Sequence, residues 1–213
     1  MQMKVISANI GKPVLVAWKG QNIETGIYKY SVNHSIYLGT EDVENDHVID
    51  RRYHGGVDKA CYLYSANHYP FWKNRYPETD FQWGMFGENL TISGLDESVV
   101  RISDQYRIGD AVVQVTQPRQ PCFKLGIRFD NPDVVNDFWS LPYPGVYLKI
   151  LEPGAVKAGD SMILIKSRPD SMTVAEVFSL FKSEYIDKEL VSKAVSDVNL
   201  AASCRRDLEK LIR

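Results

Sequence analysis

The 213-residue chain lacks the short signatures that mark many well-known sites. Its three cysteines are widely spaced, odd in number and free of any CxxC pair, which argues against a disulfide framework and a cysteine-rich metal site. Its four histidines show no HExxH or other close ligand spacing. GxGxxG and Walker A patterns are also absent, so the sequence supports neither a dinucleotide-binding fold nor a P-loop.

Charge and hydropathy exclude two further classes of protein. The net charge of -2 argues against a general nucleic-acid-binding protein, which is usually basic. The chain has no run of about 18 apolar residues, so we expect no membrane span. Its first residues hold too short an apolar run for a secretory signal. Reduced cysteines without these features favour a cytoplasmic protein.

Short strand-like segments make up most of the chain before residue 167. Many short strands with turn signals between them are typical of a barrel or a sandwich, so we predict a mainly β fold. Helices do not alternate regularly with the strands, which disfavours a doubly wound sheet. A few flanking helices are expected, at 65–76, after Cys122 and at 131–139. The predicted strands are 4–9, 13–18, 26–30, 35–38, 60–64, 90–92 and 145–151. In two further segments, 106–115 and 156–165, a Gly-Asp turn opens a β-branched run, and we expect these runs to be paired barrel strands.

The sequence pattern changes after a polar segment at 167–171. Thr173 and Glu176 have the spacing of a capping box, which predicts the start of a helix. A second helix is expected from Asp187, and a third carries Cys204 on its apolar face. The chain therefore divides into a barrel domain, 1–167, and a three-helix tail, 168–213. So small a bundle would be marginal alone, so we expect it to dock on the barrel, on a partner or on a second copy, which makes a homodimer an open expectation.

The segment Gln117–Leu125 (QPRQPCFKL) is the one most suggestive of chemistry. Its prolines stiffen the backbone around Arg119. We expect Cys122 in the first turn of a helix, where backbone N–H groups and the helix dipole favour a thiolate. Lys124 and Arg128 would add positive charge nearby. Such a cysteine suits attack on a soft electrophile, carriage of sulfur or ligation of a soft metal.

A glycine-containing polar cluster, HGGVDK, runs from His54 to Lys59. Adjacent glycines, Gly55 and Gly56, allow backbone N–H groups to approach an anion closely. Arg51 and Lys59 can pair with phosphate or carboxylate. The alternative is an ordinary turn with solvated charges.

A second polar cluster, FGENLT, lies at the entrance of a predicted strand, at 86–91. The carboxyl group of Glu88 and the amide of Asn89 can hydrogen-bond a heterocyclic ligand there. They can equally brace the mouth of a barrel, and composition alone slightly favours that structural role.

Taken in order, these motifs resemble the MOSC family, named for the C-terminal domain of molybdenum cofactor sulfurases. The resemblance covers residues 1–167 and rests on the two polar clusters, the Cys122 segment, Gly145-Val-Tyr147 and Gly159-Asp160. The tail is similar to the three-α appendage of stand-alone bacterial members. The resemblance implies a MOSC-type β-barrel with a few flanking helices and one functional cysteine, which maps onto Cys122.

The resemblance also implies binding of the molybdenum cofactor, a pterin dithiolene with a terminal phosphate, with Cys122 as a molybdenum ligand. It implies reduction of small N-hydroxylated compounds, such as N-hydroxylated bases. Because no iron–sulfur cysteine set or flavin fingerprint is present, the electrons must come from an external donor protein. The expected catalytic residues are Cys122, His54, Asp58 and Glu88, the last three as proton donors. The expected cofactor-binding residues are Arg51, Gly55, Gly56, Lys59, Asn89, Arg119 and Lys124.

Two other functions remain open from the sequence. Cys122 can carry a persulfide and deliver sulfur to a metal centre. The barrel can also bind the molybdenum cofactor and pass it on without catalysis. A structural barrel with an incidental cysteine is the simplest alternative.

Overall fold

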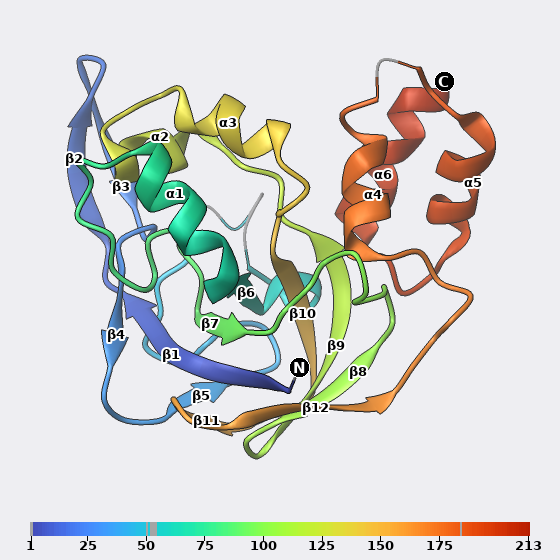
Figure 1. Cartoon of the computed structure of the whole chain (residues 1–213), viewed down its shortest axis with the longest axis horizontal. Coiled ribbons are helices and arrows are strands. Elements are labelled where there is room, and N and C mark those ends of the chain that lie inside the picture. The colour runs from blue at the N-terminus through green and yellow to red at the C-terminus, as the bar shows by residue number, and fades with distance from the viewer. Residues whose placement is uncertain (1, 50, 52–54, 184) are drawn as a thin grey trace.

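The computed structural model describes residues 2–49, 51, 55–183 and 185–213. Seven strands form a barrel in the order β12-β8-β9-β10-β6-β7-β1, and pairing of β1 with β12 closes it (Figure 1). Neighbouring strands are antiparallel except β6 and β7, which are parallel. This confirms the predicted mainly β barrel. The strands are β1 (Met3–Gly11), β6 (Cys61–Ser65), β7 (Leu90–Ser93), β8 (Gln105–Ile108), β9 (Ala111–Pro118), β10 (Val146–Glu152) and β12 (Ser161–Lys166).

Five further strands lie outside the closed barrel. β4 (Lys29–Val32) pairs with the outer part of β1. β2 (Val14–Trp18) and β3 (Gln21–Thr25) form a hairpin, and β5 (Ile36–Leu38) pairs with β11 (Gly154–Val156). The prediction of a strand at 26–30 was wrong in its boundaries: β3 ends before Gly26 and β4 begins after Tyr28. The segment QNIET has one apolar residue, so neither strand periodicity nor burial marks β3 in the sequence.

Three helices cover one end of the barrel: α1 (Tyr69–Arg75), α2 (Phe123–Phe129) and α3 (Val134–Ser140) (Figure 1). Short 3₁₀ turns, Val57–Lys59 and Ala66–His68, precede β6 and α1. An aromatic cluster packs under these helices, and Tyr69 and Trp72 lie buried in it. The helix expected at 131–139 begins at Val134 instead, because Asn131 and Pro132 form the turn before it.

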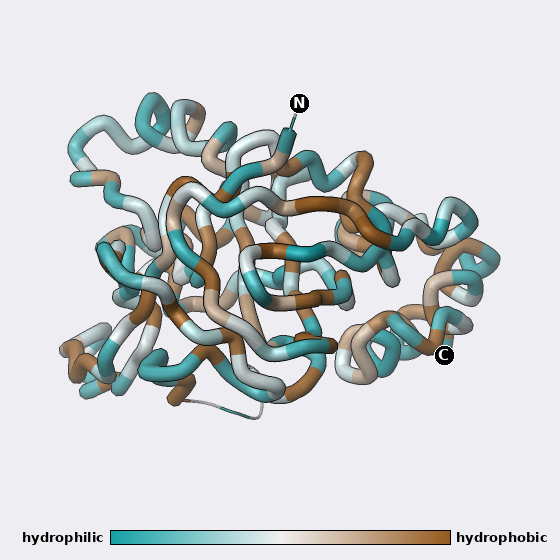
Figure 2. Tube along the Cα trace, turned by 90° about the horizontal axis from the view of Figure 1, so that it is seen from below, coloured by the Kyte–Doolittle hydropathy of each residue, from teal (hydrophilic) through white to brown (hydrophobic). Residues whose placement is uncertain are grey.

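The tail contains α4 (Val174–Leu180), α5 (Lys188–Ser196) and α6 (Ala202–Ile212), which lie together beside the barrel (Figure 1). The capping box is confirmed: the Glu176 amide donates to Thr173 Oγ1 at 3.1 Å, and the Thr173 amide donates to Glu176 Oε2 at 2.7 Å. Cys204 is buried, as its place on the apolar face predicts. Long hydrophobic stretches run through the middle of the trace, while the part near the C-terminus alternates between hydrophilic and hydrophobic residues (Figure 2).

The division of the chain at 167 and 168 stays a prediction, because α4 and α6 both contact the barrel. The Ala201 amide donates to the Thr116 carbonyl of β9 at 3.1 Å, and α4 packs on the same strand. β9 is buried along its whole length as a result. Within the described residues, no helix has both the length and the apolar character needed to cross a membrane.

Candidate functional site

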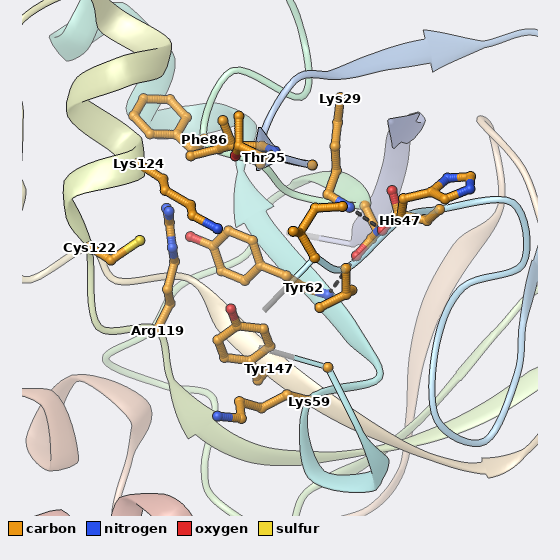
Figure 3. A pocket seen from close by; sticks show the side chains of 18 of the residues that line it. Thr25, Lys29, His47, Lys59, Tyr62, Phe86, Arg119, Cys122, Lys124 and Tyr147 are labelled. Atoms are coloured by element: carbon orange, nitrogen blue, oxygen red, sulfur yellow. Dashed lines mark hydrogen bonds and ion pairs between the residues drawn. The ribbon is translucent and has the colours of Figure 1, made fainter. Parts of the chain in front are cut away.

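A pocket opens at the helix-covered end of the barrel, with about 660 Å³ of space that no protein atom fills. Its walls come from β3, the segment between β5 and β6, the strand entrance at Asn89 and the Cys122 segment, so distant parts of the sequence meet there (Figure 3). Six of the predicted site residues line this pocket. They are Gly55, Lys59, Asn89, Arg119, Cys122 and Lys124.

Cys122 occupies the N-cap position of α2, one residue before the predicted first turn. Its backbone is extended, with φ -124° and ψ 170°, and its carbonyl accepts the Leu125 amide at 2.9 Å. The thiol is partly exposed, whereas Cys61 and Cys204 are each 1% exposed. Burial raises the pKa of both buried thiols, that of Cys204 to about 12. Cys122 is therefore the cysteine that a ligand in the pocket can reach.

Arg119 is 4% exposed, yet its guanidinium lacks a complete set of partners. The group lies 5.1 Å from the Tyr62 ring centroid and 5.4 Å from that of Phe138. Its Nη1 is buried without a hydrogen-bond partner among the described residues. Because an unpaired buried donor costs about 1–3 kcal/mol, and more when charged, this nitrogen indicates a ligand site. In Figure 3 the Cys122 thiol and the cations of Arg119 and Lys124 lie on the same side of the pocket.

The lining carries more positive than negative charge. Lys29, Lys59, Arg119 and Lys124 face a single carboxylate, that of Asp46, among the described lining residues. This carboxylate forms an ion pair with Lys29. It also accepts hydrogen bonds from the side-chain amide of Asn89 and the Gly11 backbone, both at 2.9 Å. Because cations outnumber carboxylates on this lining, the pocket suits an anionic ligand.

Lys59 and Tyr147 line the pocket beside Cys122, and burial shifts both groups. Burial lowers the pKa of Lys59, so its ammonium gives up a proton more readily. Burial raises the pKa of Tyr147 to about 12, so its phenol stays neutral near pH 7. The sequence reasoning assigned no proton-transfer role to either residue. Tyr147 lies in the Gly145-Val-Tyr147 motif, but nothing local marks its ring as a pocket residue.

Glu88 does not line the pocket, so the pocket geometry gives its expected catalytic role no support, and its contacts fit the structural alternative. Its carboxyl group is fully buried and accepts hydrogen bonds from the Tyr69 hydroxyl at 2.5 Å and the Thr91 hydroxyl at 2.8 Å. It also accepts the Gly84 amide at 2.8 Å and the Phe86 amide at 3.0 Å. These contacts tie α1 and the turn before β7 together, so Glu88 braces the barrel mouth.

Asp58 also lies outside the pocket lining and connects the barrel to the tail. Its Oδ2 accepts the amide of Ala202, the first residue of α6, at 3.2 Å. Its backbone carbonyl accepts the Thr116 hydroxyl at 2.6 Å. The Asp58 carboxylate therefore caps α6 from another part of the chain, and the pocket geometry gives its expected proton-donor role no support.

The other expected site residues lie in different places. Gly55 lines the pocket with φ +73°, and Gly56 has φ +80° but does not line it. Arg51 forms surface ion pairs with Asp42 at 2.6 Å and Glu41 at 3.3 Å, so its expected phosphate role is not supported. His54 lies outside the described residues.

Comparison with known proteins gives a consistent family match. The model of the MOSC domain matches residues 50–163. The chain is 36% identical over 206 residues to the uncharacterised protein YflK of Bacillus subtilis (strain 168), covering 97% of this chain and 93% of YflK. It is 29% identical to a protein named "Reductase" of Gibberella moniliformis (strain M3125 / FGSC 7600), covering 82% of this chain and 31% of that protein. The crystal structure of YiiM from Geobacillus stearothermophilus superposes with a TM-score of 0.83 at 30% identity, covering 99% of this chain and 100% of that chain.

Proposed function

Because this chain belongs to the MOSC domain family, we propose that it binds the molybdenum cofactor and reduces N-hydroxylated compounds with electrons from an external donor protein. The observation that carries the proposal is the pocket itself, in which one accessible thiol lies among basic side chains. The name of the fungal relative supports a reductive activity, although this chain spans less than a third of that protein.

The residues present fit the cofactor in three respects. The Cys122 thiolate is a soft sulfur ligand of the kind that soft metal centres favour. The buried Nη1 of Arg119 lacks a partner among the described residues, and a phosphate oxygen would supply one. Lys124, on the same side of the pocket, adds a second cation for that phosphate. Gly55 has no side chain, so its backbone can approach a ligand closely.

The proposed reaction converts R–NH–OH, two electrons and two protons into R–NH₂ and water. The N–O bond breaks, its oxygen leaves as water, and the external donor is oxidised. When bound, the cofactor would supply the two-electron redox chemistry. In this proposal Lys59 and Tyr147 hold the protons beside Cys122, and the lowered pKa of Lys59 makes it the better acid of the two.

The proposal is tested by assaying the cofactor-loaded protein with N⁶-hydroxyadenine and reduced methyl viologen as donor. We expect one adenine to form for every two reduced viologens that are oxidised, because each viologen supplies one electron. Liquid chromatography measures the adenine and absorbance measures the viologen. Protein prepared in a host unable to make the cofactor is the control and should show no turnover. Loaded protein that forms no amine from this substrate or from other N-hydroxylated bases would contradict the proposal.

Replacing Arg119 with methionine is expected to weaken retention of the cofactor roughly tenfold or more, because a charge-assisted hydrogen bond contributes about 1.5–3 kcal/mol. The measurement is the pterin content left after a dilution series. Arg128→Met is the matched control: this guanidinium also lies against two rings, at 4.8 Å from Tyr28 and 5.1 Å from Tyr30, and has a buried unpaired Nε, but it does not line the pocket. If the two variants retained the cofactor equally well, Arg119 would not be one of its binding residues.

A further inference from the structure

A second groove lies on the tail side of Cys122, with about 1370 Å³ of unfilled space including its open mouth. It runs between the Cys122 segment and α6, and shares Lys59, Cys122, Lys124 and Tyr147 with the first pocket. Cys122 therefore lies at the junction of two spaces. A ligand in the pocket and a ligand in the groove would meet at the thiol.

The wall of this groove that α6 provides is held in place by contacts to the barrel. The Ser203 hydroxyl donates to Gln117 Oε1 of β9 at 3.2 Å. The Asp58 carboxylate holds the amide of Ala202 one residue earlier. These bonds fix the first turn of α6 against the strand that leads to Cys122, so the groove is formed without a ligand.

Positive charge continues along the groove away from Cys122. Arg206 and Lys210 lie one turn apart on the same side of α6, and both line the groove. Asp207 is the single carboxylate among the described lining residues, and it pairs with Lys210 at 2.6 Å. Arg206 makes no ion pair with any residue that the structure describes. Like charges at this spacing repel each other, so the end of the groove on α6 favours an anionic group.

An aromatic surface lies at the other end, next to Cys122. Phe123 is 52% exposed and lines the groove. A single exposed phenylalanine is ordinary, but this residue directly follows Cys122 and lines the same groove as several cations. A planar heterocycle can stack on such a ring, and stacking of this kind contributes about 1–3 kcal/mol per base.

We propose that the groove binds the substrate as an N-hydroxylated nucleotide, with its base on Phe123 and its phosphate held by Arg206 and Lys210. This inference rests on the proposed function and names its substrate class. The N–O bond, on the base, then lies at Cys122, and two electrons from the donor and two protons convert it to N–H and water, while the phosphate takes no part. A free base would leave both α6 cations unused.

The first test is a binding measurement that needs no turnover. Isothermal titration compares adenosine 5′-monophosphate with adenosine, which differ only in the phosphate. We expect the nucleotide to bind at least about tenfold more tightly, since a charge-assisted contact contributes about 1.5–3 kcal/mol. In the double variant Arg206→Ala/Lys210→Ala the two affinities should become equal. Arg213→Ala is the control, because Arg213 directly follows α6, lies outside the groove and pairs with Glu209. Equal affinities in the unmodified protein overturn the inference.

The second test separates this inference from the proposed function. With reduced methyl viologen as donor, we expect kcat/KM for N⁶-hydroxyadenosine 5′-monophosphate to exceed that for N⁶-hydroxyadenine about tenfold. In the double variant this ratio should approach one, while kcat is retained. Equal kcat/KM values in the unmodified protein overturn the nucleotide inference alone. Absence of turnover on both substrates overturns the proposed function. If the double variant turned over normally with reduced methyl viologen and slowly only with a protein donor, Arg206 and Lys210 would serve donor docking. That result also overturns the inference.

Discussion

Replacing Cys122 with serine is expected to lower kcat/KM for N–O reduction by more than about a hundredfold. Loss of groups that merely support a metal ligand costs about 10–100-fold, and here the ligand itself would be lost. Serine presents a hard hydroxyl in place of a soft thiolate. Serine is also a favourable N-cap residue, so α2 keeps its start. Turnover with reduced methyl viologen measures the effect, and circular dichroism checks the fold.

Cys61→Ala is the matched control for this experiment. Cys61 is buried in β6 and does not line the pocket, so this variant should lose some stability but keep the activity of the folded protein. Full reductase activity in Cys122→Ser would contradict the proposed ligand. A reductant-sensitive mass increase of one sulfur atom on Cys122, without reductase activity, would favour the sulfur-carrier function.

Replacing Glu88 with alanine is expected to destabilise the fold by about 3–5 kcal/mol. The change removes the acceptor of four buried donors, two hydroxyls and two backbone amides, and each donor left unpaired costs about 1–3 kcal/mol before relaxation. Urea denaturation measures the effect. Glu152→Ala, at the exposed end of β10, is the control and should change stability by less than about 0.5 kcal/mol. A loss below about 1 kcal/mol for Glu88→Ala would show that the carboxyl group is not a brace.

The destabilisation by Glu88→Ala should also depend on pH. Burial raises the pKa of Glu88, although its hydrogen bonds act in the opposite direction. The folded protein then binds this proton more tightly than the unfolded chain does. The stability that comes from the raised pKa is fully present below the unfolded-state pKa and is lost as the pH rises through the folded-state pKa. The difference between the two proteins should therefore shrink as the pH is raised across that window.

Much of the fold can be predicted from the sequence because the signals are local. β-branched runs between glycines mark most of the barrel strands, and the capping box at Thr173 and Glu176 marks the start of α4. β3 could not be predicted, because it is one strand of a two-stranded hairpin and its residues are mostly exposed. Its pairing with β2, and not burial, makes it a strand.

The candidate site was predictable only in part. Two parts of the site can be recognised from neighbouring residues alone: the prolines and cations around Cys122, and the paired glycines that include Gly55. The pair of Lys29 and Asp46 has no such signal, since it forms only when β4 and the segment before β6 come together. Glu88 is a brace because Tyr69, nineteen residues earlier, donates to it. Such long-range contacts decide whether a polar residue is functional or structural.

The central claim is that Cys122 and the basic pocket around it hold the molybdenum cofactor. It is tested most directly by metal analysis of protein purified from a host that makes the cofactor, together with pterin fluorescence. We predict molybdenum and pterin in equimolar amounts with the unmodified chain, and loss of molybdenum in Cys122→Ala. Unmodified protein without molybdenum, from a host whose other molybdenum enzymes are loaded, would contradict the claim.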